Sequence, residues 1–266
     1  MSKGTVVTVI IGLCLICATS RADNIPLGAQ AIIDSYPQFF DKNAYKDNCL
    51  IWKDGTRMKY DDGVKKNYMQ RLDDADIEDS FHDIYDVSLS PDIPYLHDPG
   101  RTRCDAMFKK MYGNSAAKVQ KGLVSVNWFG EKVRVPSANG VDKALKAVAS
   151  EIAGHPELKK YLKSSGTFNW RQVRGAKRMS AHSYGIAFDI GVKYSTYWLW
   201  KNPGASETTK IKYYNNFPME LVKIFEKHGF IWGGAWYHYD TMHFEYRPEI
   251  IRYAQLVKVA RQKKKK

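Results

Sequence analysis

Large apolar residues alternate with small or polar ones in two short segments of the chain, 186–191 and 242–246. This period of two predicts β-strands, because successive side chains of a strand point to opposite faces of the sheet. Asp189 and His243 both stand opposite the bulky residues of their own segments. If the two strands are neighbours in one antiparallel sheet, these two side chains share a face.

A helical period appears in Val141–Ala153, where apolar residues recur at 141, 145, 148 and 152 before Gly154. This spacing predicts an amphipathic helix that a glycine terminates. Turn residues and periodicity predict further elements: helices at Arg103–Tyr112, Pro156–Leu162 and Phe217–His228, and a hairpin that joins Val124–Phe129 to Lys132–Val135. The chain therefore mixes helices with antiparallel strands, as in the α+β class.

The first residues have the pattern of a secretory signal. Lys3 precedes an apolar run, Val6–Ala18, and Ser20-Arg21-Ala22 places small residues around a cleavage site. A membrane-spanning helix needs about twenty apolar residues, and this run is shorter, so cleavage after Ala22 is favoured over an uncleaved anchor. We therefore expect a secreted or periplasmic protein of the cell envelope, without stable membrane insertion.

The remaining chain divides by composition. After a signal peptide over 1–22, we expect an N-terminal extension over 23–100, a main domain over 101–254 and a basic tail over 255–266. The formal net charge is +13, but no nucleic-acid motif accompanies it, so no nucleic-acid partner is expected. The tail is interpreted as a solvated end. If it binds a partner, anionic envelope polymers or lipid head groups fit an exported chain better.

Two cysteines, Cys49 and Cys104, follow the signal segment. In an oxidising compartment they could form one disulfide, whereas two free buried thiols are the alternative. The sequence leaves both alternatives open.

Two histidines and two aspartates stand at the spacings of a mononuclear zinc peptidase. His182 and Asp189 belong to the segment SAHSYGIAFD, and Asp240 and His243 belong to DTMHFE. Two imidazoles and one carboxylate suit Zn²⁺, and three protein ligands leave a fourth position for water. The other carboxylate, Asp240, is then free to act as a general base.

Each histidine–aspartate pair, taken alone, is more simply a hydrogen-bonded core pair, but the two pairs together favour a metal site. The sequence contains no His-Glu-x-x-His and no Gly-x-Ser-x-Gly. This excludes the usual zinc helix of the zincins and the nucleophile elbow of the serine hydrolases.

The segments SAHSYGIAFDI and WGGAWYHYDTMHFEYRPE together resemble the zinc D-alanyl-D-alanine carboxypeptidases and L-alanyl-D-glutamate endopeptidases, the VanY-like peptidoglycan peptidases. The family pattern is Ser-x-His, six residues, Asp, and later Glu or Asp-x-x-His. The resemblance is tight over Gly166–Pro248 and looser from about Cys49. It implies the hedgehog/DD-peptidase fold, in which helices pack on a small antiparallel sheet.

The same resemblance implies a role for each motif residue. His182, Asp189 and His243 would bind Zn²⁺, and Asp240 would be the catalytic base. Aspartate rather than glutamate at position 240 departs from the carboxypeptidase members and is closer to the endopeptidases.

Gly166–Arg171 looks like the segment of the family that carries a functional arginine. The planar fork of Arg171 would bind a substrate carboxylate or polarise the scissile carbonyl. A surface or fold-stabilising arginine is the alternative, and Arg174 and Arg178 compete for the functional role.

Three further residues are candidates for substrate binding. Ser180 would hydrogen-bond the substrate or shape the turn before His182. His238 would approach the oxyanion or line the wall of the cleft. Trp236 belongs to an aromatic run that would line a groove or fill the core. Glu245 shares a face with His243 and is a candidate for orienting that imidazole.

We therefore expect a monomeric, exported zinc metallopeptidase that acts on peptidoglycan peptides, with the L-Ala-D-Glu bond as its favoured target. A D-Ala-D-Ala carboxypeptidase is the alternative within enzymes. A non-catalytic cell-wall-binding module that retains zinc is the alternative of another class.

Overall fold

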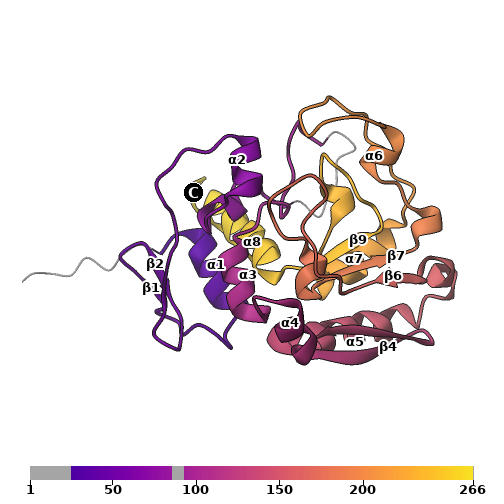
Figure 1. Ribbon diagram of the computed structural model, residues 1–266, viewed down its shortest axis with the longest axis horizontal. Coiled ribbons are helices and arrows are strands. Elements are labelled where there is room, and N and C mark those ends of the chain that lie inside the picture. Colours follow the sequence, from indigo (N-terminus) through magenta and orange to yellow (C-terminus); the bar gives the residue numbers. More distant parts are fainter. Residues whose placement is uncertain (1–24, 86–92, 266) are drawn as a thin grey trace, which may run out of the picture.

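The computed structural model describes residues 25–85 and 93–265, so the signal peptide expected over 1–22 lies outside the described residues. Helices and small antiparallel sheets alternate along the described chain (Figure 1). This mixture agrees with the α+β class that the sequence predicts.

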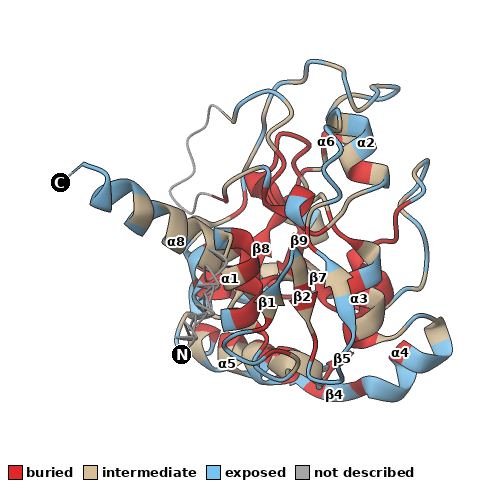
Figure 2. Cartoon of the chain, turned by 90° about the vertical axis from the view of Figure 1, so that its left-hand side faces the viewer, coloured by how far each residue is buried: buried red, intermediate tan, exposed pale blue. Residues whose placement is uncertain are grey.

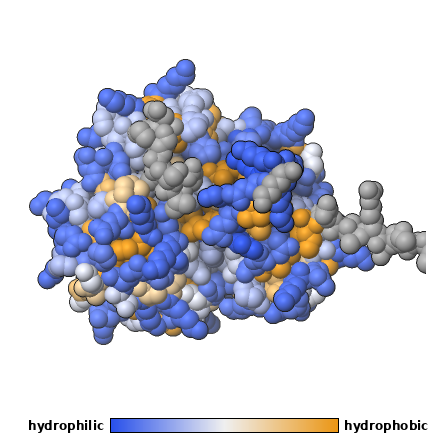
Figure 3. Space-filling model, turned by 180° about the vertical axis from the view of Figure 1, so that it is seen from behind, coloured by the Kyte–Doolittle hydropathy of each residue, from blue (hydrophilic) through white to orange (hydrophobic). Residues whose placement is uncertain are grey.

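The face of the molecule in Figure 3 is mostly hydrophilic, with apolar patches between the polar ones. Along 25–85 and 93–265, no helix combines the length and apolar character that crossing a membrane requires.

A four-stranded antiparallel sheet carries the motif residues. Its order is β6 (Ser164–Gly166), β7 (Ala187–Ile190), β9 (His243–Tyr246) and β8 (Phe230–Trp232). In the register of β7 and β9, Asp189 lies opposite His243. The prediction that these two residues share a face of one sheet is therefore confirmed.

The other face of this sheet is apolar and covered by a helix. Phe188 and Phe244 lie opposite each other on β7 and β9 and are buried. Phe225 of α7 (Met219–Lys227) stacks on Phe244 with a centroid distance of 4.0 Å. The bulky residues of the alternating pattern thus fix which face of the sheet presents the polar residues.

The predicted helices and hairpin are also present. They are α3 (Asp105–Tyr112), α5 (Val141–Ile152), α7 and the hairpin of β4 (Leu123–Trp128) with β5 (Glu131–Pro136). Pro156–Tyr161 is a 3₁₀-helix, η3, rather than an α-helix. Short helices at α4 (Ala116–Gly122) and α6 (Trp198–Lys201) complete this part of the chain.

The segment before residue 101 packs against the rest of the chain. It contains α1 (Leu27–Ser35), a small sheet of β1 (Tyr45–Lys46), β2 (Cys49–Ile51) and β3 (Arg57–Lys59), and α2 (Tyr68–Asp73). α1 lies along α8 (Pro248–Lys263), and Tyr36 at the end of α1 donates a hydrogen bond to Glu249. The described part of the extension therefore shares one apolar core with the motif-bearing sheet.

The C-terminal helix extends across the boundary at residue 254, where the predicted tail begins. α8 continues past residue 254 to Lys263, and Figure 2 shows its last turns projecting from the body with mostly exposed residues. The domain boundaries themselves stay a prediction. Cys49 and Cys104 are both free thiols, as in the alternative without a disulfide, but only Cys104 is buried and Cys49 is half-buried.

Candidate metal and catalytic site

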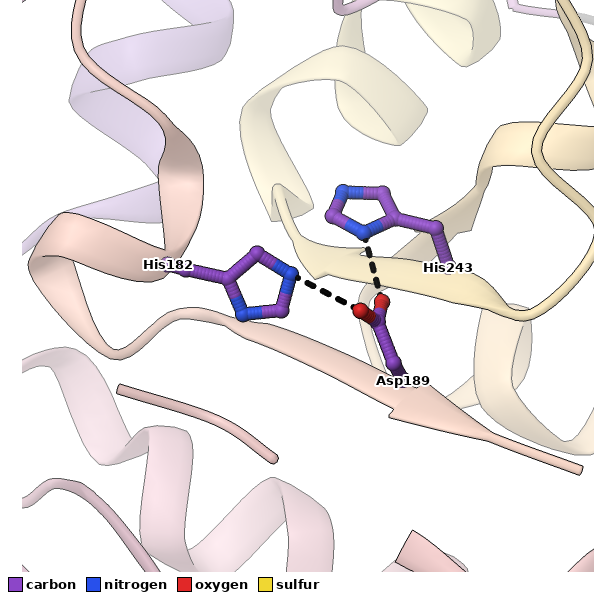
Figure 4. Close-up of side chains that lie close together, drawn as sticks. All are labelled: His182, Asp189 and His243. Atoms are coloured by element: carbon purple, nitrogen blue, oxygen red, sulfur yellow. Dashed lines mark hydrogen bonds and ion pairs between the residues drawn. The ribbon is translucent and has the colours of Figure 1, made fainter. Parts of the chain in front are cut away.

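Two imidazoles face one carboxylate at the centre of the motif-bearing sheet (Figure 4). His182 lies in the 3₁₀-helix η4 (Ala181–Tyr184), Asp189 on β7 and His243 on β9. The Nε2 of His182 lies 3.2 Å from Oδ2 of Asp189, and the Nδ1 of His243 lies 2.8 Å from Oδ1. The three ligand atoms are all within 4.8 Å of one another.

A left-handed glycine allows His182 to reach this position. Gly185 connects η4 to β7 with φ +69°, and a Cβ at this residue would meet the Leu123 side chain at 2.9 Å. A side chain is therefore disfavoured both by the backbone conformation and by the available space.

The three residues fit a zinc ion in chemistry and in orientation. The outer nitrogen of each imidazole has a partner of its own: Nδ1 of His182 faces Thr167 O at 2.9 Å, and Nε2 of His243 faces Glu245 at 2.9 Å. These contacts leave the inner nitrogens directed at Asp189. Although burial lowers the pKa of His243, Asp189 and Glu245 raise it to about 10. The site thus attracts a positive charge, and one oxygen and two nitrogen donors suit Zn²⁺.

Asp240 lies beside this triad, in the turn before β9. Its backbone bridges to Tyr197, and its N–H donates to Gly233 O. Burial raises the pKa of Asp240 to about 7, while His243 lowers it and Asp189 raises it. Its Oδ1 is shielded from solvent and has no hydrogen-bond partner among residues 25–85 and 93–265. A carboxyl that titrates near neutrality and keeps a free oxygen suits proton transfer.

Glu245 contacts the ring nitrogen of His243 that does not face Asp189. Its Oε1 lies 2.9 Å from His243 Nε2 and 3.0 Å from Nη1 of Arg103, and its Oε2 lies 3.3 Å from Arg247 Nη1. Burial alone would raise the pKa of Glu245, but Arg103, His243 and Arg247 hold it at about 2. The charged carboxylate accepts from Nε2 of His243 and so leaves Nδ1 free for a metal.

The candidate arginine, Arg171, has an exposed side chain. Its Nη1 donates to Gln172 O at 3.3 Å, and none of the carboxylates in the described chain forms an ion pair with it. Its backbone is held beside η4, because its N–H donates to Ser183 Oγ and its carbonyl accepts from Ser180 N–H. The guanidinium therefore has no carboxylate partner among the described residues, while its backbone is fixed next to η4, which carries the candidate ligand His182. Whether it acts on substrate stays a prediction.

The competing arginines have different surroundings. Arg174 is exposed. Arg178 is buried and forms ion pairs with Asp73 at 3.1 Å and with Glu207 at 3.7 Å. Arg178 is thus occupied by acidic residues of the same chain.

The three candidates for substrate binding are all buried. Ser180 directly precedes η4, and its carbonyl accepts from Ser183 N–H. Trp236 donates from Nε1 to Pro99 O, and its ring centroid lies 5.5 Å from that of His243. Trp236 therefore forms a wall beside one metal ligand.

His238 is fully buried, whereas a residue that lines the wall of a cleft would be partly exposed. Its side chain is 0% exposed, and its Nδ1 lies 2.7 Å from Oδ2 of Asp98. Asp98 also accepts from Tyr68 and from Arg101, which in turn contacts Glu207. Apart from Asp98 and Arg101, which are three positions apart, the partners come from distant parts of the sequence, so no local spacing indicated the cluster.

Comparison with known proteins gives a partial match that coincides with the site. Residues 174–246 match the model of a family described as D-alanyl-D-alanine carboxypeptidase. The matched segment contains the three candidate ligands and Asp240, and it begins after Arg171. No curated protein and no solved structure matches the chain. The match supports a peptidase, and these four candidate residues lie inside the matched segment.

Proposed function

We propose that this chain is an exported, monomeric zinc peptidase that hydrolyses the stem peptides of peptidoglycan on the hedgehog/DD-peptidase fold. One observation carries the proposal. His182, Asp189 and His243 converge beside the buried carboxyl of Asp240, whose Oδ1 has no hydrogen-bond partner within the described chain, and all four lie in the segment that matches a peptidase family.

The residues of the chain divide the chemistry between them. A zinc ion held by His182, Asp189 and His243 would polarise the scissile carbonyl and lower the pKa of water beside it. Asp240 takes a proton from the attacking water and returns it to the leaving nitrogen. The free fork of Arg171 stabilises charge on the carbonyl oxygen or anchors a substrate carboxylate. Trp236 confines the peptide beside His243.

The proposed target is the L-Ala-D-Glu bond, because aspartate at position 240 is closer to the endopeptidases in the resemblance described above. The description of the matched family favours a second candidate, the D-Ala-D-Ala bond. In both cases the residue on the leaving side of the bond carries a free α-carboxylate.

Digestion of a defined pentapeptide muropeptide, followed by mass spectrometry, tests both candidates. The zinc-loaded protein should release the peptide that begins at D-Glu. Free D-alanine with an intact L-Ala-D-Glu bond would establish the second candidate instead. Asp240→Asn is the matched control, since it should bind zinc and release neither product. No cleavage of any muropeptide by the wild type would favour the non-catalytic binding module.

A further inference from the structure

The carboxylate of Glu207 lies in a pocket of positive and hydrogen-bonding groups. Arg101 grips it through both guanidinium nitrogens, with Nη1–Oε2 and Nη2–Oε1 distances of 2.9 Å. The hydroxyl of Tyr68 lies 3.2 Å from Oε2, and Nη2 of Arg178 lies 3.7 Å from Oε1. A two-pronged arginine contact is the strongest form of carboxylate recognition in proteins.

Other residues hold this pocket in place without Glu207. Asp98 accepts from Tyr68 at 2.6 Å and from Arg101 at 3.1 Å, and Arg178 pairs with Asp73. The side chains of Arg101 and Arg178 are 11% and 4% exposed. The pocket is therefore already organised for a carboxylate, and losing Glu207 would remove its occupant rather than its walls.

A fully buried imidazole also faces the pocket. Nε2 of His238 lies 3.6 Å from Oε2 of Glu207 and forms no hydrogen bond with any part of the chain that the structure describes. An unpartnered buried nitrogen is costly unless some ligand satisfies it. Because Nδ1 donates to Asp98, a carboxylate seated slightly deeper than that of Glu207 would partner Nε2 when the ring carries a proton on both nitrogens.

Glu207 itself is carried by an irregular loop. Residues 202–218 form neither helix nor strand, and Ser206 and Thr208 on either side of Glu207 are exposed. Figure 1 shows this orange segment above β7 and β9. Loops of this length within a domain usually have a binding or covering role. The occupant of the pocket is thus carried by a loop rather than by a helix or a strand.

The pocket adjoins the catalytic groups. Tyr197 bridges to Asp240 through the backbone. The ring centroid of the next residue, Trp198, lies 4.7 Å from that of His238. His238 stands two residues before Asp240, and Arg178 stands two residues before Ser180.

We propose that Arg101, Arg178 and Tyr68 form a carboxylate subsite, which Glu207 occupies in the free protein and a substrate carboxylate occupies on binding. The identity of that carboxylate rests on the proposed function. D-Glu in a stem peptide continues through its γ-carboxyl, and a terminal D-Ala ends the chain. The leaving side therefore presents a free α-carboxylate beside either candidate bond.

Chemical rescue tests the subsite without any need for hydrolysis. Glu207→Ala should melt at a lower temperature than the wild type, and 100 mM sodium acetate should raise its melting temperature by about 3 °C relative to sodium chloride at equal ionic strength. The matched control is Glu220→Ala, which removes an exposed glutamate paired with His155. An acetate shift in Glu207→Ala no larger than in Glu220→Ala would overturn the subsite.

Kinetics then test the exchange of occupants. With a stem peptide that carries a free α-carboxylate, Glu207→Ala should lower KM about tenfold, because the loop no longer competes for the pocket. With the same peptide amidated at that carboxylate, KM should be unchanged. An equal effect on both peptides would overturn the exchange. If no variant hydrolyses either peptide, the proposed function fails, and the acetate shift still decides the subsite.

Discussion

Asp189 is central to the proposed metal site, because its two oxygen atoms face two different histidines. We predict that the wild type binds about one zinc per chain and that Asp189→Ala loses most of it, since two neutral imidazoles alone leave an incomplete ligand set. Metal analysis after dialysis against a weak chelator checks the stoichiometry. Asp240→Asn should keep its zinc in the same assay. Full occupancy in Asp189→Ala would mean that the metal binds elsewhere.

Glu245 is predicted to act on zinc through His243 rather than by direct contact. Glu245→Gln keeps the size of the side chain, but it removes the charge that holds the proton on Nε2 of His243. Loss of such an outer partner typically weakens metal affinity about 10–100-fold. Competition with a chromogenic chelator measures the change.

The control for this prediction is Glu151→Gln, which makes the same chemical change at a glutamate that pairs with Lys227 and lies outside the groups that could hold a metal. Far-UV circular dichroism should confirm that Glu245→Gln is folded, because the change also affects the buried Arg103 and Arg247. Equal zinc affinity in Glu245→Gln and the wild type would show that Glu245 pairs with Arg103 and Arg247 but does not affect zinc binding.

At the scale of elements, Asp98 connects the loop before α3 to α2 and to the turn before β9. It accepts hydrogen bonds from Tyr68 on α2 and from both the backbone and the ring of His238. Burial alone would raise the pKa of Asp98, but Arg101 and His238 hold it well below the ordinary range. The ionised form therefore stabilises the folded state at neutral pH.

The sign of the pH dependence follows from this depressed pKa. The contribution of ionised Asp98 to the free energy of unfolding is fully present above the pKa of an unfolded aspartate, about 3.9. It is lost as the pH falls towards the lower pKa of Asp98 in the folded protein. Asp98→Asn should lower the free energy of unfolding by about 3 kcal/mol at pH 7, and the difference from the wild type should shrink below about pH 4. Urea unfolding at pH 7 and pH 3 measures both differences.

A matched control is Asp54→Asn, since Asp54 forms an exposed ion pair with Lys110. Exposed pairs contribute little to stability, so this variant should unfold like the wild type at both pH values. A difference between Asp98→Asn and the wild type that is the same at pH 3 and pH 7 would show that the ionisation of Asp98 is not its source.

The elements that the sequence predicted correctly are those with a local signal. Alternation in 186–191 and 242–246 identified β7 and β9 and placed Asp189 and His243 on one face, because a strand has only two faces. The apolar residues at 141, 145, 148 and 152 identified α5, because residues three or four positions apart lie on one face of a helix.

The features that were not predicted depend on contacts between distant residues. Arg101 and Glu207 are 106 positions apart, and Arg103 and Glu245 are 142 apart. No spacing in the chain relates such partners. The prediction of a basic tail over 255–266 assigned no secondary structure to it, and α8 continues through it to Lys263. Lysine is a good helix former, so a lysine-rich end is compatible with a last helical turn.

At the scale of the whole molecule, the N-terminal segment and the motif-bearing sheet share a core. Ile32 on α1 is fully buried, while Leu27 on the same helix is 37% exposed. α1 lies along α8, which begins two residues after β9 ends. A loss of packing at α1 should therefore lower the stability of the sheet that carries the candidate ligands Asp189 and His243.

We predict that Ile32→Ala lowers the free energy of unfolding by about 3 kcal/mol through lost burial and the cavity that remains. The stability of β9 should fall by the same amount, because the described chain is expected to unfold as one cooperative unit. Urea unfolding by circular dichroism, together with hydrogen exchange of β9 amides in urea, measures both quantities. Leu27→Ala, at the exposed position of the same helix, should change neither. If Ile32→Ala destabilised α1 and left the exchange of β9 unchanged, the extension would be a separate folding unit, and the contact between α1 and α8 would be an interface between two domains.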